Sequence, residues 1–151
     1  MKLLLNTDGG SRGNPGPAAY GYVIQDITSG AGLPATVGAS ATSGAGMILE
    51  KCGKYIGITT NNIAEYEALL HGVKWVVDNE PEAELVIKMD SLLIVNQIKG
   101  LFKVKNPGLL PKYLEVKKLL ATLKKYEISH TYREGNSVAD GLVNEALDAQ
   151  Q

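Results

Sequence analysis

Cysteine is almost absent from this chain of 151 residues, which contains only Cys52. One cysteine cannot form an intrachain disulfide and excludes a cysteine-rich metal site, and such sparing use is typical of proteins from a reducing compartment. Long apolar runs are also missing. A membrane span needs ~20 consecutive apolar residues, and the three leucines at positions 3–5 are too few for the core of a signal peptide. The sequence therefore predicts a cytoplasmic protein with no membrane partner.

An excess of charge of one sign is missing as well, because 15 basic residues offset 16 acidic ones. The distribution of these charges is uneven. Eight lysines and one acid, Glu115, lie between Lys99 and Lys125, whereas seven basic and fifteen acidic residues occupy the rest of the chain. A local basic surface can bind phosphates even on a nearly neutral protein. A solvated helix face is the alternative interpretation.

The first third of the chain carries the patterns of β-strands. Residues 2–7 are mostly apolar and run into a glycine-rich turn that begins at Asp8, and residues 18–26 and 47–57 predict two further strands. The segment 28–46 between them is rich in Gly, Ala, Ser and Thr, and we interpret it as a flexible insertion. Three consecutive strands of this kind predict an antiparallel meander.

The rest of the chain alternates between helical and strand patterns. Thr60, Asn61 and Asn62 are helix-capping residue types, and Glu65 follows Asn62 by three positions, as in a capping box. We predict helices at about 62–79, 91–99, 108–124 and 137–149, and strands at 84–89 and 126–133. The order βββαβααβα predicts an α/β fold in which a five-stranded mixed sheet has helices on both faces. No domain boundary is visible, so we expect a single domain over residues 1–151.

Four of the acids stand where a predicted strand ends or a predicted helix begins. Asp8 follows the first strand and precedes glycines, which let a ligand approach closely. Asp90 follows the fourth strand, at the end where α/β sheets bind ligands. Glu65 and Asp140 lie in the first turns of two helices. If the first and fourth strands are neighbours, Asp8 and Asp90 come together.

Four carboxylates in one place would repel one another unless a cation is bound. Oxygen donors without histidine or cysteine suit Mg²⁺ or Mn²⁺, and two such ions about 4 Å apart can clamp a phosphodiester for in-line cleavage. Each acid taken alone also fits a structural role, as a turn former, a helix cap or a partner of the helix dipole. Periodicity does not decide between the two interpretations.

Four segments resemble the motifs of type 1 ribonucleases H, in the order of that family. They are TDGGSRGNPGPAAYG at 7–21, TTNNIAEYEAL at 59–69, MDS at 89–91 with VNQ at 95–97, and the stretch from Gly135-Asn136 through Ala139-Asp140 to Ala146. The resemblance runs from residue 2 to about 148, apart from the insertion. It implies a ribonuclease H-like fold and an endonuclease that hydrolyses the RNA strand of RNA/DNA hybrids with two Mg²⁺ or Mn²⁺ ions, leaving 3′-hydroxyl and 5′-phosphate ends.

The same resemblance assigns roles to particular residues. It implies that the catalytic and metal-binding acids are Asp8, Glu65, Asp90 and Asp140, and that the substrate is bound by Gly9, Asn14, Thr60, Asn61 and Asn62. A hybrid exposes 2′-hydroxyls in a shallow minor groove, where small amide side chains and bare backbone can distinguish RNA from DNA.

The chain also departs from the family pattern. Many bacterial members have a loop histidine before the fourth acid, whereas residues 131–135 of this chain contain no histidine. His130 precedes this segment but lies on a predicted strand. Arg133 or Glu134 could partly substitute for the missing histidine. A glutamine that touches RNA in many members is Leu92 here. A compact basic turn at 99–105 replaces the lysine- and tryptophan-rich handle of some members, which predicts weaker and more salt-sensitive hybrid binding.

Three other functions stay open at this point. One is a relaxed ribonuclease that also cuts double-stranded RNA. Another is a hybrid-binding module without catalysis, although binding alone does not require four mutually repelling acids. The third is the ribonuclease H domain of a retroelement. The start methionine and the full set of motifs instead favour a stand-alone enzyme, which we expect to be a monomer.

Overall fold

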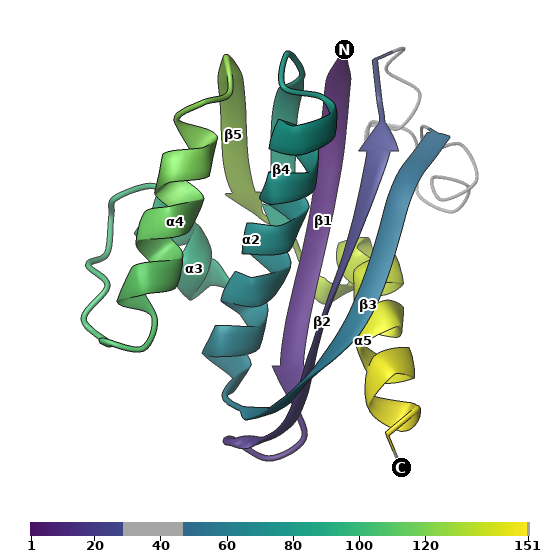
Figure 1. Ribbon diagram of the computed structural model, residues 1–151, viewed down its shortest axis with the longest axis vertical. Coiled ribbons are helices and arrows are strands. Elements are labelled where there is room, and N and C mark those ends of the chain that lie inside the picture. Colours follow the sequence, from purple (N-terminus) through teal and green to yellow (C-terminus); the bar gives the residue numbers. More distant parts are fainter. Residues whose placement is uncertain (29–46, 151) are drawn as a thin grey trace.

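The computed structural model places five strands in one mixed sheet, with helices on both of its faces (Figure 1). It describes residues 1–28 and 47–150, so the predicted insertion at 28–46 lies outside the described residues except for its first position. The elements in chain order are β1 (Lys2–Ser11), β2 (Gly16–Asp26), β3 (Met47–Thr59), α2 (Asn61–Asn79), β4 (Glu84–Met89), α3 (Leu92–Ile98), α4 (Leu110–Leu120), β5 (Lys125–His130), the short 3-10 helix η2 (Arg133–Asn136) and α5 (Ser137–Asp148). The predicted order of elements is confirmed.

The strand order β3-β2-β1-β4-β5 puts the first strand at the centre of the sheet. β1 pairs antiparallel with β2, and β2 with β3, which completes the predicted meander. On its other side β1 pairs parallel with β4, which pairs parallel with β5. The register pairs Thr7 of β1 with Met89 of β4. Asp8 and Asp90 directly follow these two residues, so they lie side by side.

Alternation along the strands divides the apolar side chains between two cores. Leu3 and Leu5 of β1 and Tyr20 of β2 belong to the larger core, which α2, α3 and α4 cover. Ala19 points to the opposite face, where it packs against Val143 and other residues of α5. Figure 1 shows α5 behind the sheet and the other three helices in front of it. No helix in the described ranges combines the length and the apolarity that a membrane span requires.

Two strand ends differ from the predicted ones by three residues or more. β1 extends to Ser11 rather than to residue 7, because the glycine-rich segment continues to pair with β2; glycine has no side chain to oppose this pairing. Asp8 therefore lies within a strand and not at its end. β5 ends at His130 instead of residue 133, and the chain then turns through η2, where the Gly135 N–H donates to the Tyr132 carbonyl at 2.9 Å.

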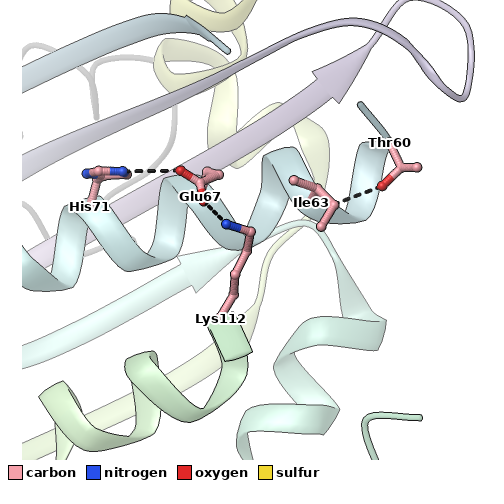
Figure 2. Close-up of polar contacts among 5 residues, drawn as sticks. All are labelled: Thr60, Ile63, Glu67, His71 and Lys112. Atoms are coloured by element: carbon pink, nitrogen blue, oxygen red, sulfur yellow. Dashed lines mark hydrogen bonds and ion pairs between the residues drawn. The ribbon is translucent and has the colours of Figure 1, made fainter. Parts of the chain in front are cut away.

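The capping box predicted for Asn62 and Glu65 is wrong. α2 begins at Asn61, and Thr60 is its N-cap. Figure 2 shows the contact, in which the Thr60 hydroxyl oxygen accepts a hydrogen bond from the Ile63 N–H at 3.2 Å. A threonine at this position satisfies one of the free N–H groups of the first turn. Glu65 is thereby left free to face β1.

Candidate functional site

A cleft of about 600 Å³ opens beside the ends of β1 and β4, and all four predicted acids line it. Asp8 comes from β1, Glu65 from α2, and Asp140 from the first turn of α5, while Asp90 directly follows β4. Carboxylate oxygens of Asp8, Glu65 and Asp90 lie within 4.8 Å of one another. The structure therefore brings together four acids that are far apart in the sequence.

Gly9 makes the approach of Glu65 to Asp8 possible. A Cβ atom on Gly9 would overlap the backbone of Ala64 and Glu65, so any other residue would push α2 away from β1. The Gly9 N–H also donates to the Glu65 carboxylate at 2.5 Å. The sequence-based prediction gave Gly9 a role at the substrate; its clearest role in the structure is to seat the first turns of α2.

Burial and the repulsion between neighbouring carboxylates raise the pKa values of Asp8, Glu65 and Asp90. Burial, the nearby carboxylates of Asp90 and Asp140, and a hydrogen bond with Asp140 raise the pKa of Asp8 from 3.8 to about 7. Burial and the carboxylates of Asp8 and Asp90 raise the pKa of Glu65 well above its usual value. Burial also raises the pKa of Asp90, although Arg133 opposes this shift. The folded site consequently favours a bound proton or a bound cation.

A divalent cation fits this donor set. The cleft offers four carboxylates, and none of the ion pairs in the part of the chain that the structure describes involves them. Carboxylate-only sites suit hard ions such as Mg²⁺ and Mn²⁺, which also relieve the repulsion between the acids. His130 lines the cleft too, but it is the last residue of β5 and its ring packs edge-on against Tyr132, with the centroids 5.2 Å apart.

The predicted substrate residues take different places. Asn61 and Asn62 line the cleft, whereas Asn14 and Thr60 are not part of its wall. The Asn61 side-chain oxygen accepts a hydrogen bond from the Ser11 N–H at 2.7 Å, and the Asn61 N–H donates to the Asn14 side-chain oxygen at 3.1 Å. The turn between β1 and β2 is thus tied to the start of α2. Since the amide oxygen of Asn61 is engaged, its NH₂ group is the part that remains available to a ligand.

Asn136 is a buried polar residue whose role the sequence did not reveal. It is 1% exposed, and its side-chain nitrogen donates to the Thr7 carbonyl at 2.7 Å. This bond joins the start of α5 to β1 one residue before Asp8, and it therefore helps to bring Asp140 to the cleft. Among the residues that the structure describes, the Asn136 side-chain oxygen and the Thr7 hydroxyl oxygen find no hydrogen-bond partner.

The predicted basic surface is smaller than the lysine count suggests. Four of the eight lysines are engaged: Lys112 with Glu67, Lys117 with the Ile98 carbonyl at 3.0 Å, Lys124 with Glu82 at 2.8 Å, and Lys125 with Glu84 at 3.7 Å. Lys99, Lys103, Lys105 and Lys118 are exposed and make no ion pair with a described residue. Three of these four belong to the turn that follows α3.

Comparisons with known proteins agree with the fold. The family model described as "Reverse transcriptase-like" matches residues 6–146. A bifunctional protein of Mycobacterium tuberculosis is 36% identical over 149 residues, which cover 99% of this chain and 36% of the relative. The ribonuclease HI of Halobacterium salinarum is 36% identical over 141 residues, which cover 93% of this chain and 62% of the relative. The chain thus spans about a third of the mycobacterial relative and less than two thirds of the archaeal one.

A solved structure gives the same result, and its match with this protein covers almost all of both chains. The crystal structure of LC11-RNase H1 in complex with an RNA/DNA hybrid matches with a TM-score of 0.82 and 37% sequence identity, over 99% of this chain and 99% of that one. On the grounds of sequence, fold and strand topology, the chain belongs to the reverse transcriptase-like family and, within it, to the type 1 ribonucleases H.

Proposed function

We propose that this protein is an endonuclease that hydrolyses the RNA strand of RNA/DNA hybrids with two divalent cations, leaving 3′-hydroxyl and 5′-phosphate ends. The observation that carries this proposal is the convergence of four acids on one cleft, three of them with carboxylate oxygens within 4.8 Å of one another. Family membership supports it, since one relative is named ribonuclease HI and one similar structure was solved with a hybrid bound.

Asp8, Glu65, Asp90 and Asp140 are the residues that would hold Mg²⁺ or Mn²⁺. When bound, two such ions lower the pKa of the attacking water and stabilise the leaving 3′ oxygen. The protein supplies the rigid support: β1 and β4 fix two acids through their parallel pairing, and Gly9 fixes the third through its hydrogen bond to Glu65. No protein nucleophile is required by this chemistry.

The rim of the cleft suits the minor groove of a hybrid. The NH₂ group of Asn61 and the side chain of Asn62 can donate to 2′-hydroxyl or base oxygens, while Gly9 and Gly10 put no side chain in the way. The hydrogen of the Thr60 hydroxyl stays free when its oxygen caps α2, so Thr60 can donate to a backbone phosphate at the helix N-terminus. Asn14 acts behind Asn61 by holding its backbone N–H.

Cleavage of end-labelled substrates tests this proposal. The wild-type chain, an Asp8→Asn variant and an Asp78→Asn control, an exposed acid paired with Lys74 on α2, are incubated with a hybrid in Mg²⁺ and in Mn²⁺. We expect the wild type and the control to cut the RNA strand and Asp8→Asn to be inactive. A wild type that binds the hybrid but cuts in neither metal would instead indicate a binding module.

A parallel reaction with double-stranded RNA measures how strict the enzyme is. If the amides of Asn61 and Asn62 select for one DNA strand, only the hybrid is cut. Cleavage of both duplexes would assign the protein to the relaxed ribonucleases. The four acids would have the same role in either case.

A further inference from the structure

Arg12 lies on the wall of the cleft and has no part in the chemistry described above. Its backbone is held on both sides of the turn between β1 and β2. The Arg12 N–H donates to the Pro17 carbonyl at 2.8 Å, and a Cβ atom on Gly16 would overlap the Arg12 carbonyl oxygen. The side chain therefore starts from a fixed position at the edge of the cleft.

Two residues near the end of α5 hold the guanidinium group. One terminal nitrogen of Arg12 lies 2.7 Å from a carboxylate oxygen of Asp148 and donates to the side-chain oxygen of Asn144 at 3.5 Å. The Asn144 side-chain nitrogen lies 3.4 Å from a carboxylate oxygen of Asp140 and donates to the Asp140 carbonyl at 3.1 Å. One amide thus connects Arg12 to the fourth acid of the site.

The placement of arginine in this chain is selective. Arg12 and Arg133 are its two arginines, and both line the cleft that holds the four acids. The acids and their cations suit the phosphate that is cleaved, whereas the neighbouring phosphates of the same strand need cationic partners. Arginine binds phosphate through a planar fork of donors, and the contacts of Arg12 with described residues use only one of its nitrogens.

We propose that Arg12 binds a backbone phosphate that flanks the scissile bond, with Asn144 keeping its side chain at the cleft. This inference rests on the proposed function, because it assumes that a nucleic acid lies across the four acids. The ion pair with Asp148 does not prevent such binding. The Asp148 side chain is 66% exposed, and an exposed carboxylate is a weak, solvent-screened partner that a phosphate can share or displace.

Equilibrium binding of a hybrid over a series of salt concentrations tests the inference, with Asp8→Asn as the background so that the substrate stays intact. We expect Arg12→Ala to weaken binding about tenfold at low salt and to reduce the slope of log affinity against log salt by about one, the loss of one phosphate contact. Arg12→Lys should keep the slope. Lys74→Ala, which removes an exposed cation paired with Asp78 outside the cleft, should change neither quantity.

Asp148→Ala separates phosphate binding from the support of α5, because it breaks the same ion pair and leaves the arginine in place. We expect its affinity to equal or exceed that of the background. If Asp148→Ala weakens binding as much as Arg12→Ala does, or if Arg12→Ala leaves the slope unchanged, the inference is overturned while the proposed function stands. If the Asp8→Asn background protein does not bind the hybrid, both the inference and the proposed function are overturned.

Discussion

Asp8 is held in the folded protein where its charge is unfavourable. It is 7% exposed, and burial together with Asp90 and Asp140 raises its pKa to about 7. The folded state therefore binds a proton more tightly than the unfolded state does, so the contribution of Asp8 to stability is fully present below about pH 4 and is lost as the pH rises through 7. Metal-free protein should be least stable above neutral pH on this account.

Asp8→Asn removes this penalty because asparagine carries no charge. In the presence of a chelator at pH 8, we expect the variant to unfold with a free energy about 2 kcal/mol larger than that of the wild type. The difference should shrink as the pH falls from 7 towards 4. Urea unfolding at a series of pH values measures it, and equal stabilities at pH 8 would contradict the assignment of a buried charge to Asp8.

Asn61 should recognise its ligand through the donors of its NH₂ group. Its side-chain oxygen already accepts the Ser11 N–H, so Asn61→Asp keeps this bond and loses the NH₂ group. We expect hybrid affinity to fall about tenfold or more, while the free energy of unfolding changes little. Asn79→Asp places the same charge at the far end of α2 and should leave affinity unchanged; an equal loss there would point to charge alone.

The sequence predicted some residues of the candidate site and missed others. Asp8, Glu65, Asp90 and Asp140 were selected because motifs mark them, and the structure gathers them in one cleft. Arg12 and Asn144 were not selected, since their contact joins segments more than a hundred residues apart and leaves no periodic pattern. The orientation of the Asn61 amide was equally hidden, because it depends on a backbone N–H from another element.

At the scale of the element, the contact between β1 and α2 depends on one glycine. Gly9→Ala would place a methyl group on the backbone of Ala64 and Glu65, and we expect a loss of about 3 kcal/mol or more in unfolding free energy together with loss of cleavage. Gly10→Ala is the matched control, since its nearest neighbour would be a Val143 methyl carbon at 3.8 Å. Thermal unfolding and cleavage assays on both variants measure the difference. Similar behaviour of the two alanines would contradict the close packing of the two elements.

The ion pair of Glu67 with Lys112 joins α2 to α4, and the charge of Glu67 gives it a definite pH dependence. Glu67 contacts His71 one turn along α2 and Lys112 of α4 (Figure 2). Hydrogen bonds from His71 and Lys112 lower the pKa of Glu67 from 4.5 to about 2, so its contribution to stability is present above pH 4.5 and is lost as the pH falls towards 2.

We therefore expect Glu67→Gln to lower the unfolding free energy by about 2 kcal/mol at neutral pH and by much less near pH 2. Asp78→Asn provides the comparison, because it breaks an exposed pair with Lys74 on the same helix and should cost little. Urea unfolding at both pH values measures the two effects. A cost for Glu67→Gln that does not depend on pH would show that packing and not charge is responsible.

The elements themselves were predictable, but some of their ends were not. The sequence patterns located the strands and the α-helices of the described ranges but not the short 3-10 helix η2. The extension of β1 to Ser11 was missed because glycines indicate a turn, whereas pairing with β2 keeps them extended. The N-cap was misplaced by two residues because Thr60, Asn61 and Asn62 are all good capping types, and only the position of the helix decides among them.

At the scale of the whole molecule, cation binding should stabilise the fold. A ligand that binds only the folded state raises the melting temperature with its concentration, and the four acids exist as a cluster only after folding. We expect Mg²⁺ and Mn²⁺ to raise the melting temperature of the wild type by several degrees, and Asp8→Asn to lose most of this response. A thermal-shift titration with Ca²⁺-free buffers measures it; an equal response of the two proteins would place the binding elsewhere.

The meander and the mixed sheet followed from the order of the elements, since three sequential strands form a meander and strand-helix-strand units form parallel pairs. The sequence left the adjacency of β1 and β4 as a condition for Asp8 and Asp90 to meet, and the structure shows that these two strands pair in parallel. The sequence did not predict which lysines make an ion pair or a hydrogen bond. It shows where lysines occur, and not which of them a carboxylate or a carbonyl contacts. The insertion at 28–46 remains a prediction.

The central position of β1 has a consequence for biosynthesis. β1 is made before β4, which supplies its parallel neighbour, and before α5, which supplies Asp140. β1, β2 and β3 can pair early through contacts between consecutive segments, but parallel pairing between distant segments is slow. The four acids of the cleft therefore come together only after α5 has been made and docked, and the proposed nuclease activity can begin only then.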